Sequence, residues 1–205
     1  MTETAAPPPA KLIAFEGGEG TGKSTQAARL AERLGARFTF EPGDTPIGQQ
    51  LRRVLLDPEA GEGMHPRAEA LLMAADRAQH VAEVVRPCLE AGQHVVTDRY
   101  LGSSLVYQGL GRGLGVDEVW ALSRFATDSL EADVVVLLEV PPAVQADRLD
   151  RDLDRLERAG DDFHERVRTG FGELAERFGW VVVDGVGSID EVEARVWAAI
   201  EDELA

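Results

Sequence analysis

A glycine-rich stretch that begins at Gly17 carries the residues of this chain best suited to bind phosphate. Gly17 and Gly22 stand five positions apart, and glycine at both positions lets the backbone wrap so that successive N–H groups point inward. Lys23 can then reach the outer phosphates as a point charge, while the Ser24 hydroxyl is placed to hold Mg²⁺ at the start of a following helix. An apolar run at residues 12–15 precedes the stretch and a helical pattern follows it, which is the context of a P-loop. We assign nucleotide binding to Gly17, Gly18, Glu19, Gly20, Thr21, Gly22, Lys23, Ser24 and Thr25.

A second candidate pair, Asp98 and Arg99, follows another apolar run at residues 94–97. A carboxylate at a strand end can organise Mg²⁺ and its waters, and a guanidinium can hold a phosphate through two hydrogen bonds. Because the carboxyl ends of parallel strands meet at one edge of a sheet, this pair should face the P-loop. The alternative is a structural ion pair.

Four arginines, Arg148, Arg151, Arg155 and Arg158, lie in a segment dense in charge of both signs. Such a run is by default an exposed helix with salt bridges on its surface. The P-loop changes this interpretation, because phosphoryl transfer needs several cations and Lys23 is the only basic residue inside the loop. Arginines of a lid could supply the rest, and closing the lid would exclude water.

Arg77 and the pair Tyr107 and Gln108 are candidates for reading the base and sugar of a second ligand. From residue types alone this signal is weak, because a lone helical arginine or a Tyr-Gln pair is more often surface or packing.

The elements that would position these residues alternate along the chain as short apolar runs and helical patterns. This alternation predicts an α/β fold with a parallel sheet covered by helices on both faces. We expect strands at 12–15, 37–40, 94–97, 134–140 and 180–183. We expect helices at 24–34, 47–56, 66–91, 116–128 and 163–178, with another from Pro142 and a last one capped by Ser188 and Glu191.

Composition limits what can be built around the loop. With 205 residues and 44% hydrophobic content, we expect residues 11–205 to form one domain with a lid at about 147–160, preceded by a disordered tail at 1–10. The net charge of −16 argues against nucleic-acid and membrane partners, because the field repels polyanions. A single cysteine, Cys88, excludes an internal disulfide and favours the cytoplasm. The sequence contains no apolar stretch as long as a membrane span.

A guanine-specific switch protein is disfavoured, because the chain contains no asparagine with which to build the Asn-Lys-x-Asp element that recognises guanine. The Asp184-x-x-Gly187 spacing is a chance match to another element of such proteins.

From about Lys11 onward the chain resembles the thymidylate (dTMP) kinase family of P-loop kinases. The resemblance covers the P-loop at 15–25, the Glu-Pro-Gly-Asp-Thr loop at 41–45, the helix segment at 74–80, residues 98–100 with Ser103, the run at 107–113, and a lid end at 153–157. It implies a three-layer P-loop kinase fold with a five-stranded parallel sheet and a short lid. It further implies ATP as donor, dTMP as acceptor, dTDP as product, Mg²⁺ as cofactor and a homodimer built through helices.

The resemblance also implies roles for individual residues. Arg77 would bind thymine, Arg99 the dTMP phosphate, and Glu19 would approach the sugar 3′-hydroxyl. Tyr107 would crowd the 2′ position, with Gln108 beside it. Because Gly20 stands where some relatives have an arginine, the catalytic arginine would come from the lid, with Arg151 as first choice and Arg148 as second.

Two positions depart from the family pattern. Phe40 replaces an arginine that holds the acceptor phosphate, and Met73 replaces a phenylalanine that stacks on the base. Arg52, on the next helix, could compensate for the first change. The alternatives are a related P-loop kinase with another small acceptor, or a nucleotide-binding protein that has lost catalysis.

Overall fold

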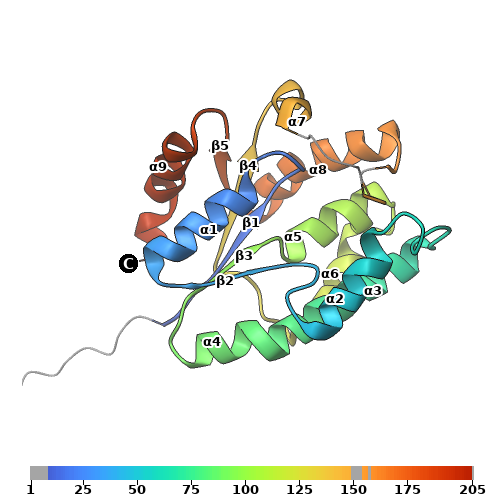
Figure 1. Cartoon of the computed structure of the whole chain (residues 1–205), viewed down its shortest axis with the longest axis horizontal. Coiled ribbons are helices and arrows are strands. Elements are labelled where there is room, and N and C mark those ends of the chain that lie inside the picture. The colour runs from blue at the N-terminus through green and yellow to red at the C-terminus, as the bar shows by residue number, and fades with distance from the viewer. Residues whose placement is uncertain (1–8, 149–153, 157, 205) are drawn as a thin grey trace, which may run out of the picture.

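The computed structural model describes residues 9–148, 154–156 and 158–204, and these form a five-stranded parallel sheet between two layers of helices (Figure 1). The strand order is β2-β3-β1-β4-β5. The strands are β1 Leu12–Glu16, β2 Arg37–Phe40, β3 Val95–Asp98, β4 Val134–Glu139 and β5 Val181–Asp184. Phe15 and Phe40 both lie in register with Asp98, so the carboxyl ends of the three strands reach one edge of the sheet. The predicted fold class is confirmed.

Helices and helical turns connect the strands. They are α1 Lys23–Leu34, α2 Pro46–Leu56, α3 Pro66–His80, η1 Val81–Val85, α4 Arg86–Glu90, α5 Leu101–Ser104, η2 Leu105–Gly111, α6 Val116–Thr127, α7 Pro142–Arg148, α8 Asp161–Phe178, α9 Ile189–Ile200 and η3 Glu201–Leu204.

The two faces of β1 show why the sheet is covered twice. Ile13 and Phe15 are buried in a cluster with residues of α1 and α9, while Leu12 and Ala14 are buried with residues of η1, η2, α6 and α8. Successive side chains of a strand point to opposite faces, so a continuous apolar strand requires helices on both sides. Local signals fix several ends: Gly35 closes α1 at φ 61°, and Ser188 and Glu191 form the predicted capping box of α9.

The helix predicted at 66–91 is interrupted by the π-helical turn η1. Pro87 has no N–H to donate to the carbonyl four residues earlier, and a π turn lets the chain continue in one direction without that bond. Cys88, in α4, is a free thiol and half-buried.

The helical segment from Leu101 to Gly111 was not predicted, because three glycines weaken the helical pattern. Packing explains two of them. A Cβ on Gly102 would lie 2.8 Å from the Glu16 carboxylate, and one on Gly111 would lie 2.7 Å from the Phe163 ring. Close approach to neighbouring elements therefore requires glycine there.

Most of the N-terminal tail, part of the lid, and Arg151 lie outside the described residues. In the described part of the chain, no helix is long and apolar enough to cross a membrane.

Candidate active site

The P-loop leaves β1 and enters α1 at the carboxyl edge of the sheet. Gly17, Gly20 and Gly22 have φ values of 140°, 72° and 93°, which favour glycine over other residues. The Lys23 side chain is almost fully buried and its Nζ donates to the Gly18 carbonyl at 3.1 Å. Burial and the nearby Arg99 lower the pKa of Lys23, although neighbouring carboxylates oppose this shift. The Lys23 ammonium thus lies against the loop that was predicted to bind the phosphates.

Ser24 and Asp98 come together as predicted, from the start of α1 and the end of β3. The Ser24 hydroxyl donates to Asp98 Oδ2, while Asp98 Oδ1 is buried and has no hydrogen-bond partner among the described residues. A hydroxyl beside a carboxylate whose second oxygen has no hydrogen-bond partner fits a Mg²⁺ ion that takes its other ligands from phosphate and water. The described residues contain no group of three or more His, Cys, Asp or Glu that could hold a metal alone.

Arg99 contacts the P-loop rather than Asp98. Its Nη1 donates to the Gly17 carbonyl at 3.1 Å and to Ser103 Oγ at 2.9 Å, and its Nη2 pairs with the Glu19 carboxylate. The Tyr107 ring centroid lies 5.3 Å from the guanidinium carbon. Burial lowers the pKa of Arg99, but the charges around it outweigh burial and raise that pKa above its ordinary value. The predicted phosphate-binding arginine therefore joins the P-loop to the acceptor side of the site.

Glu16, which the sequence analysis did not single out, holds the turn that carries Arg99. Its buried carboxylate accepts hydrogen bonds from the N–H groups of Tyr100 at 3.1 Å and Ser103 at 2.9 Å, and from Ser103 Oγ at 2.5 Å. Arg99 itself has φ 71°, an uncommon value for a residue with a side chain. The signal in the sequence was an acidic residue at the end of a buried strand.

Arg77 is buried at the inner wall of the site. Its Nε donates to Glu41 at 2.8 Å, and its terminal nitrogens donate to Ser123, to the Tyr100 carbonyl and to Ser104 at 3.0 to 3.1 Å. Glu41 also pairs with His80 Nδ1 at 2.9 Å, so the predicted base-binding arginine is fixed by the loop after β2.

Arg52 lies near Phe40, one of the two departures from the family pattern. Its Nη1 donates to the Pro42 carbonyl at 2.6 Å, and its guanidinium carbon lies 5.8 Å from the Phe40 ring centroid. Arg52, Phe40 and Met73 all line the cavity, which brings together the three residues expected to shape acceptor binding.

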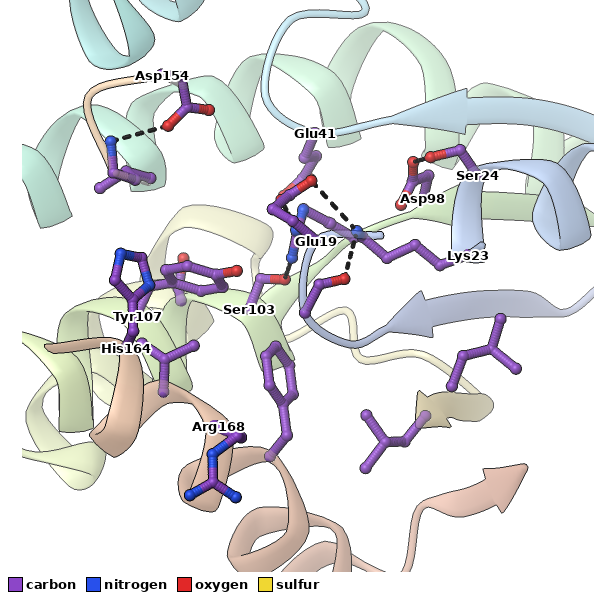
Figure 2. A pocket seen from close by; sticks show the side chains of 18 of the residues that line it. Glu19, Lys23, Ser24, Glu41, Asp98, Ser103, Tyr107, Asp154, His164 and Arg168 are labelled. Carbon is purple, nitrogen blue, oxygen red and sulfur yellow. Dashed lines mark hydrogen bonds and ion pairs between the residues drawn. The ribbon is translucent and has the colours of Figure 1, made fainter. Parts of the chain in front are cut away.

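Tyr107 and Gln108 lie on η2, against α8. The Tyr107 ring packs 6.1 Å from Phe163 and 6.0 Å from Phe171, and burial raises the pKa of its hydroxyl to about 12. Gln108 Nε2 donates to Glu69 Oε1 at 3.0 Å. Figure 2 shows Tyr107 and His164 on one side of the site, Lys23, Ser24 and Asp98 on the other, and Glu19 between them.

The lid arginines separate into different environments. Arg148 donates to the carbonyls of Gly20, Thr21 and Gly185 at 3.2 to 3.4 Å, which places it against the P-loop backbone. Arg155 pairs with Glu69 at 2.8 Å instead of reaching the P-loop.

One cavity of about 1640 Å³ connects these groups. Typical ligand pockets measure about 300 to 1,000 Å³, so this space suits two nucleotide-sized ligands. Lining residues include Lys23, Arg52, Met73, Arg77, Arg99 and Gln108.

Comparison with known proteins is consistent with this arrangement. A sequence model of the thymidylate kinase family matches residues 15–196. The chain is 47% identical over 202 residues to thymidylate kinase of Bifidobacterium longum (strain NCC 2705), covering 94% of this chain and 96% of that protein. It is 45% identical over 202 residues to thymidylate kinase of Deinococcus radiodurans, covering 93% and 96%. The crystal structure of thymidylate kinase from Ehrlichia chaffeensis superposes with a TM-score of 0.78 at 26% identity, covering 95% of this chain and all of that one.

Proposed function

The chain belongs to the thymidylate kinase family and phosphorylates dTMP in dTTP synthesis, and we propose that its cavity holds ATP at the P-loop and dTMP against α3 and η2. The observation that carries this assignment of sites is Arg99, which contacts the P-loop at Gly17 and Glu19 and also lies against Tyr107. During phosphoryl transfer, negative charge lies on the phosphoryl group that moves from donor to acceptor, and a cation between the two sites can stabilise that charge.

On the donor side, the P-loop N–H groups and Lys23 bind the ATP phosphates. Ser24 and Asp98 would hold Mg²⁺, which neutralises charge on the phosphate oxygens when it is bound. Asp98 keeps one oxygen without a protein partner among the described residues, which supports this role.

On the acceptor side, Arg99 and Arg52 bind the dTMP phosphate, and Glu19 approaches the sugar. Arg77, Met73, Tyr107 and Gln108 contact the nucleoside. Transfer then consists of attack by a dTMP phosphate oxygen on the γ-phosphorus of ATP, with cleavage of the bond to the β-phosphate oxygen, giving dTDP and ADP.

The lid supplies the remaining cation. Arg148 contacts P-loop carbonyls, so it is positioned at the donor side, and Arg151 stays our first choice for the migrating phosphoryl group. Arg151→Ala should lower kcat by about thirty- to thousandfold with little change in KM for dTMP, because such a contact is made in the transition state. A greater loss in Arg148→Ala would reverse the assignment, and full activity in both variants would exclude a lid arginine.

A homodimer through α2, α3 and α6 completes the proposal. These neighbouring helices expose Ile47, Val54, Leu71 and Phe125, and Phe125 is 88% exposed. Apolar side chains gathered on adjacent helices mark a protein interface. Light scattering should show a dimer that Phe125→Glu disrupts; a monomer in the unaltered protein would contradict it. With a single free thiol, Cys88, the chain also fits the reducing cytoplasm.

The assay that tests the function measures ADP release with Mg²⁺ and ATP across a panel of acceptors. dTMP should be phosphorylated faster than dCMP, AMP, GMP or a small acid. Preference for another acceptor would favour a related P-loop kinase, and no turnover with any acceptor would favour a non-catalytic nucleotide-binding protein.

A further inference from the structure

Glu69 on α3 is a fully buried carboxylate behind the acceptor side of the cavity. Three side chains from other elements converge on it. Arg112 Nη2 and Arg155 Nη1 lie 3.0 and 2.8 Å from Oε2, and Gln108 Nε2 lies 3.0 Å from Oε1. Gln108 lines the cavity whereas Glu69 does not, so Glu69 can influence an acceptor only through its neighbours.

The contact with Glu69 fixes which end of the Gln108 amide faces the cavity. An amide accepts at its oxygen and donates at its nitrogen, whereas an ionised carboxylate only accepts. Burial alone would raise the pKa of Glu69, but hydrogen bonds from Arg112 and Gln108 and the charge of Arg155 hold it below its ordinary value. The amide nitrogen of Gln108 must therefore face Glu69.

The oxygen of that amide remains available. No group among the described residues donates a hydrogen bond to Gln108 Oε1. This oxygen is nevertheless not fully buried, so a ligand can still reach it. Gln108 lines the cavity and its Nε2 is taken by Glu69, so Oε1 is the end of the amide that is left to accept a hydrogen bond from a ligand there.

We infer that Glu69 is a positioning residue for base selection: it holds Gln108 so that the site receives a pyrimidine that donates a hydrogen at N3. This inference rests on the proposed function. Thymine and uracil both carry N3–H, which can donate to Gln108 Oε1. Cytosine has a bare lone pair at N3, so two acceptors would face each other and neither would be satisfied. A site built to pair with a substrate N–H rejects an analogue that lacks it.

The competing explanation is that Glu69 only anchors two arginines. Arg155 also donates to the Leu55 carbonyl at 2.7 Å, so the cluster ties the end of the lid to α2. A purely structural anchor predicts that disrupting the cluster lowers stability and lowers activity toward all acceptors alike. Base selection predicts a change confined to cytosine.

The decisive variant is Glu69→Gln, assayed by kcat/KM for dTMP, dUMP and dCMP, with its melting temperature recorded. Two neutral amides can pair in either orientation, so Gln108 can turn its nitrogen toward N3 of cytosine. The dTMP to dCMP preference should fall about tenfold, equivalent to one hydrogen bond. The dTMP to dUMP ratio should stay within about twofold, because both bases donate at N3.

Arg112→Ala is the matched control. It removes a cation from the same carboxylate but leaves Arg155 and the Gln108 contact in place. It should lower stability and keep the dTMP to dCMP preference. If Glu69→Gln keeps that preference, or if Arg112→Ala loses it equally, Glu69 does not orient Gln108 for base selection.

Gln108→Leu provides a second test if Glu69→Gln does not fold. It removes the amide while both arginines still pair with Glu69, and it should lose the same preference; retained preference would overturn the inference. Failure of the wild-type protein to prefer dTMP would instead refute the proposed function, and the inference with it.

Discussion

Glu16→Gln tests how Arg99 is held, because it changes hydrogen bonding and charge while keeping side-chain shape. Glu16 Oε1 accepts from the N–H groups of Tyr100 and Ser103, and Oε2 accepts from the Ser103 hydroxyl. In glutamine, the oxygen can keep both N–H contacts. The amide nitrogen then occupies the position that accepted from Ser103 Oγ and cannot accept, so the hydrogen bond from that hydroxyl to a charged group is lost.

The expected loss of activity follows from the one hydrogen bond that is removed. A hydrogen bond to a charged group contributes about 1.5 to 3 kcal/mol. Ser103 Oγ also receives Arg99 Nη1 at 2.9 Å, so the change reaches the guanidinium through one shared hydroxyl. If the whole loss appears in the transition state, kcat falls by about tenfold to about 150-fold.

The assay is steady-state kinetics with dTMP and ATP, on protein shown by circular dichroism to be folded. Ser104→Ala is the control, because this neighbouring hydroxyl contacts Arg77 at 3.0 Å and not Arg99. It should raise KM for dTMP more than it lowers kcat. A Glu16→Gln enzyme that keeps kcat within about threefold of wild type would refute the idea that Glu16 positions Arg99.

The remaining predictions concern the acceptor side of the site. Burial and the Glu41 carboxylate raise the pKa of Asp76 from 3.8 to about 6, so ionisation costs more in the folded than in the unfolded state, and stability should fall as pH rises from about 4 to about 6. Asp76→Asn should abolish this loss of stability, which at 1.36 kcal/mol per pH unit is about 3 kcal/mol. Urea unfolding of both proteins at pH 4 and pH 7 measures the loss. An equal change in stability with pH in the two proteins would contradict the prediction. Arg52→Ala should weaken dTMP binding and leave ATP binding almost unchanged in calorimetry, whereas unchanged dTMP affinity would leave Arg99 as the named phosphate clamp. Met73→Phe should lower the dTMP dissociation constant by about two- to tenfold through an aromatic stack, and a weaker complex would show that the pocket is overpacked.

The P-loop and the sheet could be predicted because their signals are local. Glycine spacing, Lys23 and Ser24 lie within nine residues, and alternating apolar runs follow the strand and helix periods. The meeting of Ser24 with Asp98 also followed, since parallel strands end at a shared edge.

The supporting carboxylates could not be predicted in the same way. Glu16 is 84 and 87 positions from Tyr100 and Ser103, and no spacing rule relates them. The partner of Arg155 could not be predicted from the sequence either. Its charged segment suggested a lid cation, but only the folded chain shows that it pairs with Glu69 on α3.

These contacts share one physical logic that explains how so acidic a chain forms an anion site. Glu16 lies behind Arg99, Glu41 behind Arg77 and Glu69 behind Gln108, and each carboxylate comes from a different element. A buried cation without a partner costs several kcal/mol, so a cluster of arginines could not wait unpaired for a dianionic substrate. Each carboxylate accepts hydrogen bonds from buried N–H or O–H groups on the inner side of the site. These bonds also fix the orientation of the side chains that line the cavity. Preorganisation of this kind means that binding energy from the acceptor is not spent on ordering the site.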